Sequence, residues 1–167
     1  MPKLIRLKDH AFAWAEDRFT QVADEDPIPA GDVILSLKRF MTEGEALLAN
    51  RAVGVRLQPD EKVEDLAYDL PRLPVVALVF PKFRDGRNYS AARLLRERYG
   101  YSGEVRAIGE VLREQALHMV RCGVDAFAPA DGASPDDWAA AVGRYRHVYQ
   151  RAADDREPVF VERGTGS

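Results

Sequence analysis

The spacing of five short, mainly apolar runs is the feature of this sequence that most restricts its fold. Successive runs begin 20 to 29 residues apart, and a helical pattern follows each one. Such an interval has room for one helix and two connections, whereas a hairpin needs only a few residues. The spacing therefore predicts parallel strands joined by helical crossovers. The predicted strands are Val33–Leu37, Val53–Leu57, Val75–Phe80, Glu104–Ile108 and Asp125–Ala128.

Helical periodicity fills the intervals between these runs. Apolar residues recur at i, i+3, i+4 and i+7 from Val63 to Leu70 and from Trp138 to Tyr145. Shorter patterns of the same kind cover Ala91 to Leu95 and Leu112 to Val120. We therefore expect one amphipathic helix in each of these segments.

Residues typical of helix ends mark several of the predicted boundaries. Thr42 with Glu45 forms a capping-box pattern. Ser134 precedes a proline and two acidic residues, as at many helix N-termini. Gly100 and Gly123 follow helical stretches, where a glycine can end the helix.

These patterns predict an α/β fold with a parallel sheet of about five sequential βα units, similar to part of a TIM barrel. The alternative is a flavodoxin-like doubly wound sheet, because periodicity does not determine strand order. Residues 1–30 are expected to form an N-terminal hairpin and a connection, residues 31–152 the βα repeats, and residues 153–167 a polar tail. We expect residues 1–167 to form a single domain, since domains of about 100–200 residues are common. The open edges of an incomplete barrel also suggest a homodimer.

Composition narrows the class of protein. The chain has 46% hydrophobic and 31% charged residues, a net charge of −3 and a pI of about 5.7. This balance does not favour nucleic acid or a membrane surface as a partner. Cys122 is the single cysteine, which excludes an internal disulfide framework and suits a reducing cytoplasm. We expect a cytoplasmic protein.

The segment after the third predicted strand is the strongest candidate for a ligand site. Ligands in parallel α/β sheets bind beyond the carboxyl ends of the strands. This segment, Pro81 to Ser90, contains three cationic residues, a glycine and two residues that could cap a helix. Arginine forks suit sulfate, sulfite, phosphate or carboxylate groups, so the pattern predicts a small-anion or phosphate site. The alternative is a turn with solvated charges and an Arg–Asp pair.

Two further arginines, Arg56 and Arg106, lie within predicted strands. A parallel strand covered on both faces should be almost entirely apolar, and a buried charge needs a partner. The arginines either line a pocket on an open face of the sheet or form structural ion pairs with acidic residues.

Other reactive groups carry weaker signals. Cys122 is predicted at a helix C-terminus, where the helix dipole opposes a thiolate, so a buried structural cysteine is favoured. The three histidines lack ligand spacing, and we expect no metal site. The sequence has neither a GxGxxG motif after a strand nor a P-loop motif, so it identifies no cofactor.

Three stretches resemble a bacterial family known as domain of unknown function 934. They are Phe83 to Arg96, Gly103 to Gly109, and Met119 to Phe127. Members of that family are commonly labelled probable oxidoreductases of sulfite reduction and are encoded beside sulfite reductase and phosphoadenylyl-sulfate reductase. The resemblance therefore implies a role in assimilatory sulfate and sulfite reduction, with subunits of those reductases as partners. The candidate anion- or ligand-binding residues, from the motif and the strands, are Arg84, Asp85, Gly86, Arg87, Tyr89, Ser90, Arg93, Arg106, Arg121 and Arg56.

Three functions remain open at this point. The first is an accessory protein of sulfite reduction that binds a small anion or phosphorylated ligand at the loop after the third strand. The second is an enzyme acting on a sulfur oxyanion or an adenylyl-sulfate-type substrate, with Arg87 neutralising the anion and Asp85 orienting it or acting as base. The third is a flavin or nicotinamide oxidoreductase without a standard fingerprint.

Overall fold

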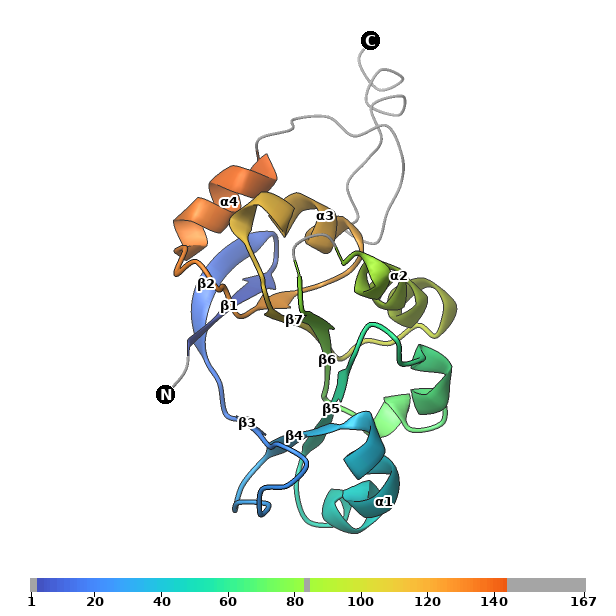
Figure 1. The fold of residues 1–167 in the computed structure, drawn as a ribbon. Helices are drawn as coiled ribbons and strands as arrows, with labels where there is room; N and C mark the ends of the chain where they lie inside the picture. Colours follow the sequence, from blue (N-terminus) through green and yellow to red (C-terminus); the bar gives the residue numbers. More distant parts are fainter. Residues whose placement is uncertain (1–2, 83–84, 144–167) are drawn as a thin grey trace.

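The computed structural model describes residues 3–82 and 85–143, and its centre is one curved sheet of eight strands (Figure 1). The strands are β1 (Lys3–Lys8), β2 (Ala11–Glu16), β3 (Thr20–Gln21), β4 (Val33–Ser36), β5 (Val53–Leu57), β6 (Val75–Phe80), β7 (Glu104–Gly109) and β8 (Ala126–Phe127). The α-helices are α1 (Leu37–Leu48), α2 (Arg87–Arg93), α3 (Ala116–Arg121) and α4 (Pro135–Gly143). Shorter helical segments are η1 (Val63–Leu66), η2 (Leu70–Arg72), the π-helical η3 (Leu94–Arg98) and η4 (Arg113–Gln115).

The sheet is mixed, so the prediction of a parallel sheet of about five βα units is wrong. The strand order is β2-β1-β8-β7-β6-β5-β4-β3. Neighbours from β3 to β8 run parallel, whereas β1 pairs antiparallel with both β8 and β2. The N-terminal hairpin, β1 and β2, is therefore part of the main sheet and extends it beyond its last parallel strand. Spacing along the chain could not reveal this pairing, because it joins segments more than 100 residues apart.

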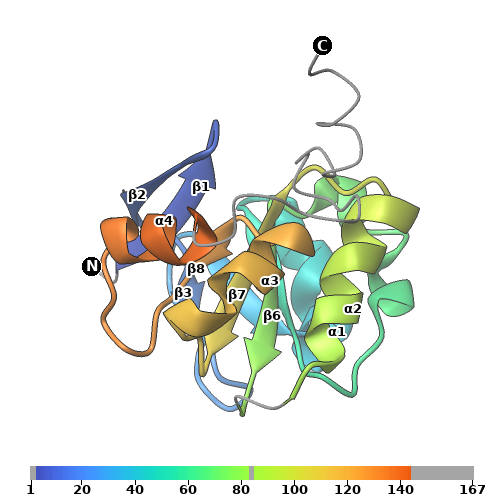
Figure 2. The ribbon, with the colours of Figure 1, turned by 90° about the horizontal axis from the view of Figure 1, so that it is seen from above.

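The doubly wound alternative is also wrong. From β3 to β8 the spatial order follows the chain without a reversal, so the sheet has no switch point of the flavodoxin kind. Figure 1 shows α1, α2, α3 and α4 arranged along the outer side of the curved sheet, and Figure 2 shows α3 and α4 side by side. The result is a half-barrel with helices on its convex side.

The two faces of the sheet are buried by different groups. On the convex side, strand residues such as Val55, Leu78 and Phe127 pack with helix residues such as Leu95 and Trp138. On the concave side a smaller cluster contains Phe19, Ile34, Val75, Ala77 and Ile108. Residues alternate between these faces because successive side chains of a strand point in opposite directions.

Phe19 reaches the concave side from the chain between β2 and β3. This segment joins the two ends of the curved sheet (Figure 1). Phe19 is 6% exposed, so the connection acts as a partial plug for the half-barrel. The sheet can therefore stay open without leaving this apolar face in water.

Several local predictions can be compared with the helices. Helix α1 begins earlier than the Thr42 pattern indicated, because Ser36 caps it and its hydroxyl accepts from Arg39 N at 3.2 Å. The predicted helix from Val63 to Leu70 is wrong, since η1 and η2 are two short 3₁₀ segments there. Pro71 and the following Pro74 limit helix growth in this interval.

The predicted start of the last helix is confirmed. The Ser134 hydroxyl accepts from Asp137 N at 3.2 Å, and the Asp137 carboxylate accepts from Ser134 N at 2.8 Å. The glycines Gly100 and Gly123 have φ angles of +59° and +101°, as expected after helices. The periodic residues beyond Gly143 lie outside the described residues. Within 3–82 and 85–143, no helix has the length and apolar character needed to span a membrane.

Candidate ligand-binding site

The loop after β6 lies at the carboxyl end of a central strand and contains a tight Arg–Asp pair. Arg87 Nη2 donates to Asp85 Oδ2 at 2.8 Å, and Arg87 Nε donates to Oδ1 at 3.1 Å. The Arg87 side chain is 62% exposed, whereas that of Asp85 is 16% exposed. Hydrogen bonds from Arg87 lower the pKa of the Asp85 carboxyl, and Asp85 raises the pKa of Arg87 in return. Gly86 ends the loop at the start of α2, and Arg84 lies outside the described residues.

The end of β7 lies tightly against the end of β6. Glu110 N donates to the Phe80 carbonyl at 2.7 Å. Gly109 makes this approach possible, because its φ is +94° and a Cβ there would lie 2.6 Å from the Phe80 oxygen. The carboxyl ends of β6 and β7 are thereby held together.

Asn88 and Ser90 are the two residues of this segment that could cap a helix, but the Asn88 side chain instead bonds to the sheet. Its side chain is buried, and Nδ2 donates to the Val79 carbonyl at 2.8 Å and the Leu57 carbonyl at 3.2 Å. Asn88 thus joins the start of α2 to the carboxyl ends of β5 and β6. This contact fixes the position of Arg87 relative to the sheet. Its sequence signal is a polar residue at an otherwise apolar helix position, which is ambiguous.

The other candidates on α2 diverge from this pair. The Tyr89 ring packs 5.1 Å from Phe80 and 4.2 Å from His118, and burial raises the pKa of Tyr89 to about 12. Ser90 and Arg93 instead line a surface hollow of about 390 Å³. Arg93 pairs with Glu97 at 3.4 Å. The α2 candidates therefore do not converge on one concave site.

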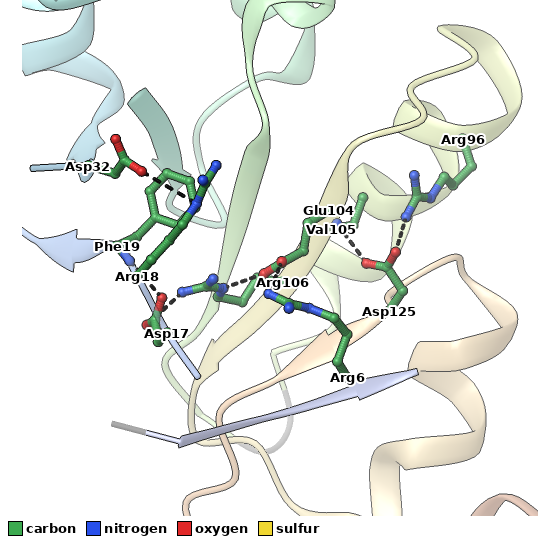
Figure 3. A network of polar contacts seen from close by, with 10 residues as sticks. All are labelled: Arg6, Asp17, Arg18, Phe19, Asp32, Arg96, Glu104, Val105, Arg106 and Asp125. Atoms are coloured by element: carbon green, nitrogen blue, oxygen red, sulfur yellow. Dashed lines mark hydrogen bonds and ion pairs between the residues drawn. The ribbon is translucent and has the colours of Figure 1, made fainter. Parts of the chain in front are cut away.

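Arg106 lies on the concave face in a buried ion-pair network (Figure 3). The side chain is 1% exposed and donates to Asp17 Oδ2 at 2.9 Å and to Glu104 Oε1 at 2.7 Å. Arg6 donates to the other oxygen of Glu104, also at 2.7 Å. The structural ion pair is thus the arrangement found, and the network leads toward the amino end of β7, away from the Arg87 loop. A cavity of about 460 Å³ beside it is lined by Arg6, Glu16, Arg18, Phe19, Pro74, Val75 and Glu104.

Arg56 lies in register with Arg106 across Ala77 of β6, and Arg121 lies on α3. Arg56 is half-buried on β5, and its Nη2 donates to the Val22 carbonyl at 3.3 Å. Arg121 is half-buried at the end of α3. The structure thus separates the predicted residues into the loop after β6, helix α2, the concave face and the end of α3.

Arg96 has a structural role that the sequence did not reveal. It donates to the carbonyls of Tyr101 and Gly103 at 2.7 Å and of Gly123 at 2.9 Å. Its Nη2 lies 3.2 Å from the Asp125 carboxylate, whose pKa is raised by burial. Figure 3 shows this contact beside β7. Arg96 therefore fastens the π-helical segment to the amino ends of β7 and β8.

The remaining reactive groups provide no further centre among the described residues. Cys122 is 3% exposed, which agrees with a buried structural cysteine. Residues 3–82 and 85–143 contain no cluster of three or more His, Cys, Asp or Glu side chains that could hold a metal ion.

Comparison with known proteins gives one family match. A model described as a bacterial protein of unknown function, DUF934, matches residues 54–160. The match begins within β5 and covers more than half of the 167-residue chain, including the Arg87 loop and Arg106. No curated protein matches the chain. The chain therefore belongs to the DUF934 family of bacterial proteins.

Proposed function

We propose that this protein is an accessory protein of assimilatory sulfite reduction that binds a small anion or phosphorylated ligand at the loop after β6. The pathway rests on the sequence resemblance described above. The proposed binding site is based on one observation. After the carboxyl end of β6, the exposed guanidinium of Arg87 holds the carboxylate of Asp85 through two nitrogens. Sulfite reductase or phosphoadenylyl-sulfate reductase subunits would be its protein partners.

The geometry of the Arg87 fork supports an oxyanion as ligand. Nε and Nη2 already hold two oxygens of one carboxylate, at 3.1 and 2.8 Å. Sulfite, sulfate and phosphate present pairs of oxygens with similar spacing, so they suit the same donors. The ligand must compete with Asp85, and Asp60 also lies close enough to raise the pKa of Arg87. We therefore expect weak binding, with a dissociation constant on the order of 1 mM, about 4 kcal/mol of binding free energy.

The state of Asp85 favours binding over proton transfer. Its pKa is lowered by hydrogen bonds from Arg87. A general base works best when its pKa is near the operating pH, and a strongly ionised carboxylate is a weak base. Asp85 is therefore better suited to orienting Arg87 than to acting as the base of an enzyme.

Thermal denaturation with and without anion tests the site. Sulfite, sulfate or phosphate at about 20 mM, at constant ionic strength, should raise the melting temperature of the wild-type protein, because a ligand that binds the native state stabilises it. Arg87→Ala should abolish the increase. Arg87→Lys should keep only part of it, because lysine retains the charge but not the fork.

Arg72→Ala is the matched control. Arg72 also holds a carboxylate through two nitrogens, at 3.0 and 2.9 Å from Glu45, but it is the last residue of η2, near the amino end of β6. Each variant is compared with its own anion-free protein. If Arg87→Ala responds to the anions as the wild type does, the proposed site is wrong.

A deletion strain tests the pathway separately. Growth on cysteine but not on sulfate or sulfite would support a step at sulfite reduction, and complementation with Arg87→Ala would show whether the loop is needed. Co-purification of a tagged chain with a sulfite reductase subunit would support the accessory role. Normal growth of the deletion strain on sulfate would contradict the pathway.

A further inference from the structure

The two outer edges of the sheet differ in how well they are protected. The edge strand β3 has two residues, Thr20 and Gln21. The opposite edge, β2, has six residues, Ala-Phe-Ala-Trp-Ala-Glu. Natural sheets protect their edges with short strands, lysine, proline or bulges, because an open edge can pair with another strand. The β3 edge is protected by its length, whereas β2 has none of these features.

The backbone of β2 is regular and ready to pair. Its register with β1 runs without a bulge from the Lys3–Glu16 pair to the Lys8–Ala11 pair. Asp9 and His10 both have positive φ, 51° and 64°, which is the conformation of a two-residue type I′ turn. Such a turn makes the Lys8–Ala11 pair hydrogen-bonded, and the pairs alternate from there. The N–H and C=O groups of residues 12, 14 and 16 therefore point away from β1, toward an edge that no other strand of residues 3–82 and 85–143 occupies.

The side chains of β2 are also exposed to a degree unusual for apolar residues. Trp14 is 47% exposed, and Ala11 and Ala13 are exposed as well. Phe12 lies on the same face as Trp14 and packs 6.2 Å from Phe127. The strand thus has an aromatic face next to the convex core and an alanine face on the other side.

We propose that β2 is a pairing surface for a second copy of this chain, in an antiparallel strand pair with a two-fold axis at Ala13. A two-fold axis perpendicular to the sheet keeps equivalent residues of the two copies on the same face. Residues that lie directly opposite each other must share a face, so an even-numbered residue can lie opposite only an even-numbered one, and an odd-numbered residue only an odd-numbered one. With the axis at Ala13, Phe12 lies opposite Trp14 of the second copy, and the reverse pair also forms. The backbone N–H and C=O groups of residue 12 in each copy then hydrogen-bond to those of residue 14 in the other copy.

The charges at the ends of β2 fit this register. The register places Glu16 of each copy beside His10 of the other. In both of these contacts the imidazole can donate a hydrogen bond to the carboxylate. An axis at Trp14 would instead place Phe12 opposite Glu16. The Ala13 register therefore pairs aromatic with aromatic and acid with imidazole, which favours a second copy as the occupant of the edge.

The length of the strand sets the expected strength. A six-residue edge pair buries less than the roughly 1,600 Å² of a standard interface. The dimer should therefore be reversible, with a dissociation constant on the order of 10 μM, about 7 kcal/mol. The resulting sheet would run continuously through both copies.

Sedimentation equilibrium of the full chain between about 1 μM and 1 mM tests the proposal. The wild type should change from monomer to dimer across this range. Ala13→Lys and Ala13→Glu each place like charges opposite one another at the axis, so each variant alone should dimerise at least about fivefold more weakly. A 1:1 mixture of the two should recover the dimer, because the charges are then opposite.

Gln21→Lys is the matched control, because Gln21 is an exposed residue of the other edge strand. It should dimerise as the wild type does. A wild type that stays monomeric at 1 mM, or Ala13 variants that dimerise normally, would overturn the proposal. Should the Ala13 variants fail to fold, hydrogen exchange of the wild type decides: the Phe12 and Trp14 amides should gain protection as concentration rises, and fast exchange at all concentrations would overturn it.

Discussion

Arg106 shows how this fold keeps a charge inside a mainly apolar sheet. The guanidinium is buried on the concave face and has two carboxylate partners, Asp17 and Glu104. The Arg106 Nη2 atom has no hydrogen-bond partner among the described residues. A buried ion pair adds little net stability, but breaking it leaves a charge that is costly to bury. The sheet is therefore stable only when the β2–β3 connection places Asp17 beside Arg106.

Asp17→Asn should lower the free energy of unfolding by about 3 kcal/mol, because it removes one partner of the buried Arg106 charge. The amide can still accept the hydrogen bond that Asp17 takes from Phe19 N at 3.0 Å. Urea denaturation at neutral pH measures the change. Glu97→Gln is the control: its pair with Arg93 is exposed, and a loss under about 1 kcal/mol is expected. Equal losses for the two variants would contradict the role of the network.

Gly109→Ala should lower the free energy of unfolding by about 2–3 kcal/mol. The φ of +94° disfavours any side chain, and the new Cβ would also lie 2.6 Å from the Phe80 carbonyl oxygen. Gly31→Ala separates these effects, since Gly31 has a φ of +93° and open space around it. We expect it to lose about 1 kcal/mol, the backbone cost alone. Denaturation midpoints that are the same for both variants would exclude the steric effect.

At the scale of elements, an aromatic pair joins α2 and α3. His118 on α3 packs 4.2 Å from Tyr89 on α2. Burial lowers the pKa of His118 below 6.5, and the nearby Arg93 and Arg121 lower it further. The neutral imidazole is therefore the form that fits this contact.

This contact should make stability depend on pH below neutrality. With its pKa lowered in the native state, His118 takes up a proton in the unfolded chain first, so stability is lost as pH falls below about 6.5. Melting temperatures between pH 7.5 and pH 5 should fall less steeply for His118→Phe, which keeps the ring contact. Arg93→Gln should have a smaller effect in the same direction. An unchanged pH profile for His118→Phe would contradict this role.

At the scale of the whole molecule, the first residues of the chain complete a sheet made mostly from later ones. The β1 strand covers the edge of β8, and residues 17 and 19 fill the concave face beneath β6 and β7. The matched family region begins only at residue 54. Residues 3–22 therefore provide an edge strand, a plug and an ion-pair partner to that region.

A chain lacking residues 1–22 should lose cooperative folding. It would expose the β8 edge and the concave cluster and leave the Arg106 charge without Asp17. Circular dichroism during thermal denaturation should show a broad transition, and ANS fluorescence should rise. A shortened chain with a sharp transition near that of the full chain would show that the N-terminal segment is dispensable.

Parts of this fold could be predicted because their signals are local. The predicted strands 53–57 and 75–80 coincide with β5 and β6, since continuous runs of β-branched and other apolar residues favour a buried strand. The Asp85–Arg87 pair joins residues two positions apart, and an Arg–Asp pair in that loop is one of the two arrangements that the sequence predicts. By contrast, Asp17 and Arg106 are 89 residues apart, and no periodicity connects them.

The sequence by itself determined the positions of β4 to β8, the start of the last helix and the cationic segment after the third predicted strand, because side-chain sequence and turn residues act over a few positions. Only the tertiary structure decided that the sheet is mixed, that Arg106 is an internal ion-pair residue, and that the candidate residues lie in separate regions. These outcomes depend on which distant segments bury each other's surface, and the energy of such contacts is a property of the folded chain as a whole.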